Sequence, residues 1–348
     1  MGNPARPTQA GRPGTGQLPA ARELRGAWAR LRKTPPPLAK TARDRPCVGG
    51  HAGGMWIIVT LAAAFFQCVR TFQQRGLKGR LSTNGANFVR YIYGAPLALA
   101  GLAAVVAVSG QPLPAMPGDF WVSVILGGLA QILATSALLL AITRDSFAVG
   151  TALSKTEALQ AAVIAALFFG EHVGWGGALA ILAGFGGVAL LTLKSLNLRD
   201  LLGRGGAYGL LSGFFFGWSA MFFRDASLAL ASPLPVLAAL VTLSAATCTQ
   251  TLMLGGWLLL REPGMISKVF QTWRAAVPVA VLSALGSACW FLAFTLQKAA
   301  YVRALGQAEL VFTVLASTLL LREKFGFREA SGTIIITGAI IALLTLTR

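Results

Sequence analysis

Five ionisable residues lie well inside long apolar stretches of this chain, namely Arg90, Lys155, Glu157, Arg303 and Glu309. A charged side chain at the centre of a membrane-spanning helix costs at least about 2.5–3.5 kcal/mol, so each needs a partner or a polar cavity. The glutamates could bind a cationic or zwitterionic ligand or exchange a proton, and the three cations could receive a carboxylate or a phosphate. Alternatively, the five groups neutralise one another and only tie helices together. The sequence leaves these interpretations open.

Spacing along the chain places Glu157 near the middle of its apolar stretch. It follows Asp145 by 12 residues and precedes Glu171 by 14, which correspond to roughly 18 Å and roughly 21 Å of helix. Lys155 lies only two residues from Glu157, so the two side chains point in different directions and pair poorly.

Three further residues of interest lie in the same kind of stretch. Gln307 is two residues ahead of Glu309 and is a candidate polar companion for it. Trp218 and Trp290 lie inside their stretches, and together with the aromatic run 214–216 they could form a wall for an organic ligand. Ordinary helix packing is the alternative for these rings.

The remaining titratable residues do not indicate a catalytic or metal site. Glu171 and Glu323 occupy short loops beside His172 and Lys324, where we expect solvated ion pairs at helix ends and no ligand binding. The four cysteines and two histidines show no metal-ligand spacing. We therefore expect no catalytic residue, no metal and no cofactor.

The elements that carry these residues are membrane helices. Hydrophobic residues make up 55% of the 348 residues and charged residues only 12%, with a mean hydropathy of +0.65, whereas a soluble domain carries about a quarter charged residues. Apolar runs of about 20 residues can cross a bilayer only as helices. We predict an all-α integral membrane protein with ten transmembrane helices, at residues 55–72, 86–109, 119–143, 146–170, 173–194, 206–229, 233–260, 275–297, 300–321 and 330–347.

Residues 1–54 differ from everything after them. They are rich in Pro, Gly, Ala and Arg, and ten of the thirty Lys and Arg residues fall within the first 45 positions. Such a segment cannot bury enough apolar surface to fold alone. It is either a disordered basic tail that touches anionic lipid or a stretch upstream of a true start at Met55. The other cations lie mostly at the ends of apolar runs, as helix anchors do, so we expect no nucleic-acid partner despite the net charge of +18.

The chain contains an internal duplication. A shift of 152 residues superimposes the third to fifth apolar runs on the eighth to tenth without a gap, and it aligns Glu157 with Glu309 and a second glutamate pair 14 residues later. Each half holds five runs, an odd number, so the second half must cross the membrane in the opposite direction. We predict two inverted five-helix repeats at 55–195 and 206–348. In secondary transporters such repeats enclose the substrate site at their interface.

Glycines recur in the last run of each half. Gly184, Gly186 and Gly187 lie in the fifth run, and Gly332 and Gly338 lie in the tenth. We expect them to form small-residue faces that allow close helix packing.

The segments that contain the glutamates resemble a known family. In each half, Glu157 or Glu309 precedes an apolar run, a second glutamate and a Gly-rich helix. This order is similar to the fourth and fifth helices of EamA-type drug/metabolite transporters, where the pattern is Glu-Pro, an apolar run, Leu-Gly-Glu-Arg and a Gly-rich helix. The 14-residue spacing matches in both halves, but Ala158 and Leu310 replace the proline, which indicates a divergent branch. The likeness covers residues 55–348.

The resemblance implies an inverted five-plus-five bundle with a central cavity and alternating access. We expect a multi-pass secondary transporter of the cytoplasmic membrane, exporting a small metabolite or drug and not acting as an enzyme. An ion gradient or exchange would drive it, because no nucleotide-binding loop is present. An anionic-metabolite exchanger is the alternative substrate class, and a membrane-embedded enzyme or a structural membrane component are the alternative functions. Expected partners are a small-molecule substrate and membrane lipid, with a homodimer as one option. The Lys/Arg distribution leaves the orientation open.

Overall fold

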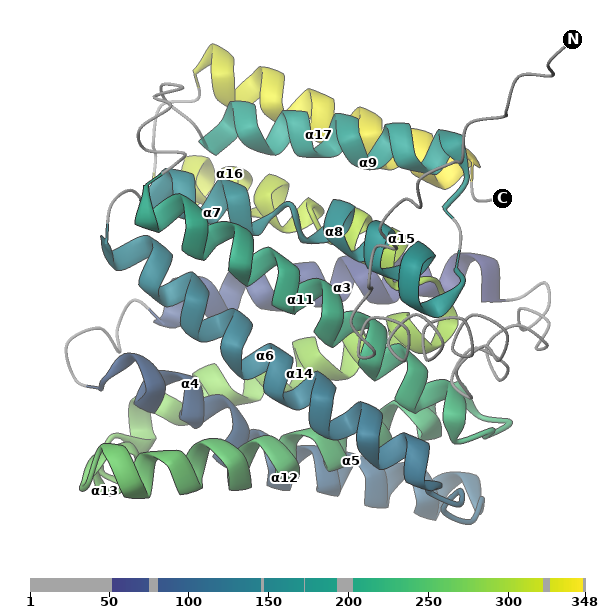
Figure 1. The fold of residues 1–348 in the computed structure, drawn as a ribbon, viewed down its shortest axis with the longest axis vertical. Coiled ribbons are helices and arrows are strands. Elements are labelled where there is room, and N and C mark those ends of the chain that lie inside the picture. Colours follow the sequence, from purple (N-terminus) through teal and green to yellow (C-terminus); the bar gives the residue numbers. More distant parts are fainter. Residues whose placement is uncertain are drawn as a thin grey trace, which may run out of the picture.

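Ten helices of membrane-spanning length form one bundle (Figure 1). The computed structural model describes residues 52–74, 81–144, 147–171, 173–192, 203–321 and 326–346. No strand occurs within these ranges. The prediction of an all-α membrane protein with ten spanning helices is therefore confirmed.

The first repeat comprises α3 (Ala52–Gln74), α4 (Thr83–Ile92) with α5 (Gly94–Ser109), α6 (Gly118–Arg144), α7 (Phe147–Ser154) with α8 (Glu157–Ile164) and the π-helical turn η2 (Ala165–Phe169), and α9 (Trp175–Thr192). The second comprises α11 (Arg204–Ala229), α12 (Pro235–Arg261), the short α13 (Met265–Gln271), α14 (Trp273–Leu296), α15 (Ala299–Leu305) with α16 (Ala308–Leu321), and α17 (Phe327–Leu346).

The 152-residue offset extends beyond the runs in which the sequence revealed it. α4 begins at Thr83 and α12 at Pro235, and α9 begins at Trp175 and α17 at Phe327, so each pair of starts differs by 152. The second spanning helix of each half therefore obeys the same register as the third to fifth.

The two repeats are interlocked. α3 packs against α14, α15 and α16 of the second repeat, and α11 packs against α6, α7 and α8 of the first. The first helix of each repeat thus lies against the third and fourth helices of the other. The α9–α17 pair covers one side of the bundle, and α4, α5, α12 and α13 lie on the opposite side (Figure 1). The packing in the middle of the molecule therefore consists largely of contacts between the two repeats.

Three spanning helices that the sequence predicts as continuous are broken. The second is interrupted at Tyr93, the fourth at Lys155 and Thr156, and the ninth at Gly306 and Gln307. At the last two breaks the backbone tightens into 3₁₀-type turns, in which an N–H group donates to the carbonyl three residues earlier. The Thr156 N–H donates to the Leu153 carbonyl at 3.2 Å, and the Gln307 N–H donates to the Ala304 carbonyl at 3.2 Å. These turns keep the backbone hydrogen-bonded, as a lipid environment requires.

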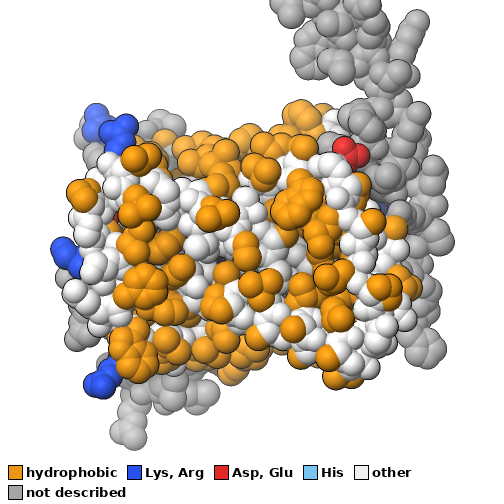
Figure 2. Space-filling view, turned by 90° about the horizontal axis from the view of Figure 1, so that it is seen from below, with side chains coloured by type: hydrophobic (Ala, Val, Ile, Leu, Met, Phe, Trp, Pro, Cys, Tyr) orange, Lys and Arg blue, Asp and Glu red, His pale blue; other side chains and the backbone are white. Residues whose placement is uncertain are grey.

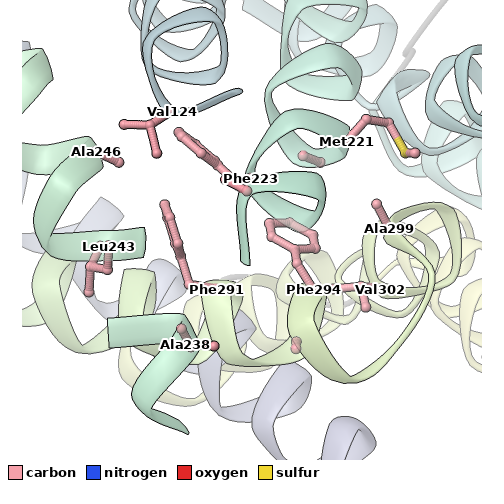
Figure 3. Packing of buried hydrophobic residues seen from close by; sticks show 14 of the residues in the cluster. Val124, Met221, Phe223, Ala238, Leu243, Ala246, Phe291, Phe294, Ala299 and Val302 are labelled. Carbon is pink, nitrogen blue, oxygen red and sulfur yellow. The ribbon is translucent and has the colours of Figure 1, made fainter. Parts of the chain in front are cut away.

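The main hydrophobic core lies between α6, α11, α12 and α14. Phe223 and Phe291 point toward one another there (Figure 3), with ring centroids 4.5 Å apart. Val124 and Leu243 come from the flanking helices and are at most 2% exposed. The core therefore joins helices of both repeats.

In Figure 2, Lys and Arg side chains gather at one end of the bundle, an acidic side chain lies near the other end, and the surface between them is mostly apolar. We call one end the basic end, defined by Arg204, Arg261, Lys268, Arg274 and Arg328 at or near helix termini. The loops at the other end, which we call the opposite end, join α5 to α6, η2 to α9, α11 to α12 and α14 to α15.

The glycine prediction is correct for three of the five residues. A Cβ added to Gly187 would lie 2.8 Å from Ile336 Cγ1 and 3.0 Å from the Gly332 carbonyl, so α9 and α17 approach closely through these glycines. Gly184 likewise leaves room for a neighbouring side chain. Gly186 and Gly338 have no atom within 4 Å of such a Cβ, because they face away from the contact, and for them the prediction is wrong.

We expect Gly187→Ala to destabilise the protein by about 1–3 kcal/mol, because the added methyl group would overpack the α9–α17 contact. The adjacent Gly186→Ala substitution is the matched control. It adds the same methyl group into open space and should be neutral or slightly stabilising, since alanine favours helix. Thermal unfolding of both variants in detergent measures the difference. Equal melting temperatures would contradict the proposed close contact.

Candidate functional site

Each central glutamate is paired with a cation from the other repeat. Glu309 Oε2 lies 2.8 Å from Lys155 Nζ, and Glu157 Oε2 lies 3.5 Å from Arg303 Nη1. All four side chains are at most 15% exposed. Of the interpretations that the sequence allows, mutual neutralisation thus describes these four groups, and the partners cross between repeats. Lys155 does not pair with its near neighbour Glu157, as its spacing predicted.

The helix breaks put these four charges at helix ends. Glu157 begins α8 and Glu309 lies in the first turn of α16, where the helix dipole favours an anion. Arg303 lies in the last turn of α15, and Lys155 directly follows α7, where the dipole favours a cation. The half-helices therefore stabilise each charge in addition to its partner.

A polar bridge through α3 links the two ion pairs. Gln67 Nε2 donates to Glu309 Oε2 at 2.7 Å, and Gln67 Oε1 accepts from the Trp290 indole N–H at 3.1 Å. The Trp290 ring in turn lies 5.1 Å from the Arg303 guanidinium, which is the partner of Glu157. One connected cluster therefore spans both repeats.

Aromatic rings surround Arg303. Its guanidinium lies 5.1 Å from the Trp290 centroid, 5.2 Å from Phe294 and 5.6 Å from Phe216, distances at which cation–π attraction operates. A Cβ on Gly306 would come within 2.3 Å of the Trp290 ring. The glycine at the break of the ninth helix is thus what allows this ring to lie over the charge.

Gln307 and Trp218 lie away from this cluster. Gln307 faces α9, where a Cβ on Gly184 would come 2.6 Å from its Oε1, and its Nε2 is buried without a hydrogen-bond partner. It lines a small cavity of about 10 Å³ between α9, α15 and α17. Trp218 stacks on Phe222 and contacts Phe168, which is 56% exposed. The two tryptophans do not form one aromatic wall.

Arg90 is the predicted site residue that lacks an anionic partner within the described part of the chain. Its Nε is buried without an acceptor, and its guanidinium lies 5.8 Å from the Tyr91 ring. Arg70 on α3 also has a buried, unpaired Nε, and its charge is repelled by Arg90 and attracted by Glu309. The two arginines add positive charge beside a cluster that is otherwise neutral.

A small polar cavity of about 10 Å³, enough for about one water molecule, lies at Arg90, between α4, α5, α6, α12 and α14. Tyr91, Gln131, Thr247 and Ser283 are among the polar residues that line it. Gln131 is 13 residues from each end of α6, so the cavity lies near the middle of the bundle.

A second charged cluster closes the opposite end. Arg224 Nε donates to Glu171 Oε1 at 2.9 Å, and Arg224 Nη1 donates to the carbonyls of Phe294 at 2.6 Å and Gln297 at 2.7 Å. The expected ion pair of Glu171 is present, but the expected solvated setting is wrong, because both side chains are only 14% exposed. The interlocked helices enclose them. Glu323 lies outside the described residues.

Several site residues were missed by the sequence analysis. Gln67 and Arg70 lie within the first apolar run. A polar residue inside such a run needs a partner, so their position alone could have marked them as candidate site residues. Asp225 follows Arg224 near the end of the sixth run, yet it is 7% exposed and accepts a hydrogen bond from Ser123 at 2.6 Å. Its burial could not be recognised without knowing that α11 packs against α6.

Comparisons with known proteins agree with this architecture. The family described as the EamA-like transporter family matches residues 54–193 and again residues 203–345. No curated protein matches the sequence. One solved structure, described only as the crystal structure of a protein, superimposes with a TM-score of 0.64 and 16% identity, covering 85% of this chain and 99% of that chain. This likeness supports the fold alone.

We expect Lys155→Met to destabilise the protein by about 3–5 kcal/mol, because it leaves Glu309 buried without its cation. Adding Glu309→Gln removes the orphaned charge, so the double variant should recover most of the loss. Thermal unfolding in detergent measures both, and Lys268→Met, at an exposed position of the basic end, is the control. Losses that simply add in the double variant would show that the pair is not coupled.

Proposed function

Because this chain belongs to the EamA-like transporter family, we propose that it is a secondary transporter that exports a small metabolite or drug by alternating access. The family is one of membrane transporters, and the ten spanning helices make the chain a multi-pass membrane protein. The substrate class, the direction and the driving force are part of the proposal.

The observation that carries the proposal is the pair of broken helices joined by crossed charges. The fourth and ninth spanning helices are interrupted at equivalent places, and each bears a glutamate that pairs with the other repeat. Discontinuous helices at a repeat interface are where secondary transporters bind substrates and coupling ions. A purely structural bundle has no need of four charges at this depth.

The crossed pairs supply a mechanism for the proposed alternation. Lys155–Glu309 and Arg303–Glu157 hold the two repeats together in the conformation described here. Rocking one repeat against the other requires these contacts to lengthen, and a proton or a charged substrate group could then replace the cation beside either glutamate. Exchange of partners at Glu157 and Glu309 would couple transport to an ion gradient or to a counter-substrate.

We place the protein in the cytoplasmic membrane and propose no enzymatic activity. The four charges of the crossed pairs are committed to contacts between helices, and most loops between described helices are short. The α9–α17 side exposes Trp175, Leu179, Phe327 and Ile334, which suits contact with lipid and would equally suit a second copy of the chain.

Glu157→Gln and Glu309→Gln should each lower transport in proteoliposomes by at least about tenfold, equivalent to about 1.4 kcal/mol. Each substitution keeps the side-chain size but removes the charge that must exchange partners. The assay measures accumulation of a panel of neutral, cationic and anionic compounds, with and without an imposed proton gradient.

Glu329→Gln is the matched control, because Glu329 lies in the first turn of α17 at the basic end, away from the crossed pairs. It should transport like the parent. Unchanged transport by both glutamate variants, in protein that elutes as a folded species, would overturn the carboxylate mechanism. A parent protein that transports no compound class would contradict the proposed function itself.

A further inference from the structure

Arg224 joins three elements at the opposite end of the bundle. Its Nε donates to Glu171 Oε1 at 2.9 Å, and its Nη1 donates to the carbonyls of Phe294 and Gln297 at 2.6 Å and 2.7 Å. Glu171 belongs to the first repeat, whereas the other residues belong to the second. Among the described residues, Glu171 forms no other ion pair, and its Oε2 is buried without a hydrogen-bond partner. One arginine therefore fastens the two repeats together at this end.

The position of this ion pair suits a contact that breaks and re-forms. Arg224 lies five residues before the end of α11 at Ala229, which is roughly 8 Å of helix. Water at the membrane surface can solvate both charges once they separate. An exposed ion pair contributes little stability, whereas a buried charge that loses its partner is costly. The pair at the end of the bundle therefore separates more easily than the two central pairs.

Phe294 connects this contact with the centre of the bundle. Its carbonyl is among the last four of α14, which lack a partner within the helix, and Arg224 satisfies it. Its ring stacks on Trp290 at 5.8 Å and lies 5.2 Å from the Arg303 guanidinium. Arg303 is the partner of Glu157. The backbone of Phe294 thus contacts the pair at the end, and its ring contacts a cation at the centre.

The fourth spanning helix carries Glu157 and Glu171 with the π-helical turn η2 between them. The N–H groups of Gly170 and Glu171 both donate to the Ala165 carbonyl. The equivalent residues of the second repeat, 317–321, are α-helical in α16, so the widened turn belongs to one repeat. Such turns occur mostly at functional sites. Its conversion to α-helix would rotate Glu171 by about 100° relative to Glu157 and take the carboxylate away from Arg224.

The two ends of the bundle are fastened by different residues. The residue 152 positions before Arg224 is Phe72, so the repeat cannot build the same contact at the basic end. There, Glu262 joins the repeats instead, accepting hydrogen bonds from Ser82 at 2.5 Å and Asn84 at 2.9 Å at the start of α4. A substitution in one fastening should therefore affect one end alone.

We propose that Arg224 and Glu171 form the gate of the opposite end, and that Phe294 links this gate to the Arg303–Glu157 pair. The inference rests on the proposed function, because it assigns the contact that breaks when this end opens. Separation of Arg224 from Glu171 frees the end of α14, and the Phe294 ring then moves off Arg303 with its backbone. Opening and the exchange of partners at Glu157 therefore occur together. Arg224 acts as a positioning residue, since it does not contact Glu157.

The gate can be tested by pulsed EPR on full-length protein in lipid nanodiscs, with the four native cysteines replaced by serine. Trp175→Cys and Ala231→Cys carry nitroxide labels at exposed positions of the opposite end, one in each repeat. A second labelled pair, Arg261→Cys with Phe327→Cys, reports on the basic end. The measured quantity is the population of each label-to-label distance.

Glu171→Gln keeps the side-chain size and removes the charge that holds Arg224. A longer distance at the opposite end should therefore gain at least about fivefold in population, while the basic-end distance stays the same. Arg224→Lys keeps the charge without the planar fork and should give an intermediate population. Ser123→Ala, which removes the neighbouring buried hydrogen bond to Asp225, is the matched control and should behave like the parent. An unchanged opposite-end distance in Glu171→Gln, or equal broadening at both ends, would overturn the gate.

Glu157→Gln tests the link through Phe294. Because it releases Arg303, it should raise the same long-distance population by at least about fivefold. Phe294→Leu removes the ring but keeps the carbonyl, and in this background Glu157→Gln should have no further effect. Phe291→Leu, one turn earlier and packed on Phe223, is the control and should preserve the effect. No response to Glu157→Gln, or the same response in every background, would contradict the link. Since label distances require no substrate, failure of the gate is distinguishable from failure of transport.

Discussion

The interaction on which the rest of the structure depends is the neutralisation of charge at the centre of the membrane. A lone carboxylate or ammonium at that depth is strongly unfavourable, so Glu157 and Glu309 can exist there only with their cations in contact. Those cations come from the other repeat. The two halves of the chain are therefore not independent folding units, because each requires the other to bury its own glutamate.

This requirement explains the helix breaks and the interlocked packing together. An unbroken fourth or ninth helix would place its glutamate in mid-helix, without the dipole of a helix start to favour it. α3 must enter the second repeat for Gln67 to reach Glu309 and Trp290. α11 makes the reciprocal insertion into the first repeat and brings Phe216 to Arg303. The ion pairs, the helix breaks and the interlocked packing of α3 and α11 thus all serve to bury the two glutamates with their charges neutralised.

The sequence allowed the helix number, the duplication and the depth of the glutamates to be predicted, because hydropathy and a fixed offset are properties of the chain itself. Partner choice could not be predicted. Lys155 is two residues from Glu157, yet it pairs with a glutamate 154 residues away, and only the packing of the repeats decides this. Gly186 and Gly187 are neighbours of identical type that face different surroundings. Residue type therefore identified the candidate contact residues, but which of them face a neighbouring helix depends on how each helix is rotated in the bundle.

The duplication is symmetric in its glutamates and asymmetric in its cations. Residues 152 positions from Lys155 and Arg90 are Gln307 and Thr242, and the residue 152 positions before Arg303 is Thr151. Two ideal inverted repeats would exchange roles and give two states of equal energy. Here the cations differ between halves, so the two states of the alternating access that we propose would differ in free energy even without substrate. The same asymmetry places Arg90 in the wall of the cavity, where the second repeat offers only hydroxyl, amide and apolar groups. The unequal states of the proposed alternation and the extra arginine beside the cavity therefore follow from the same substitutions between repeats.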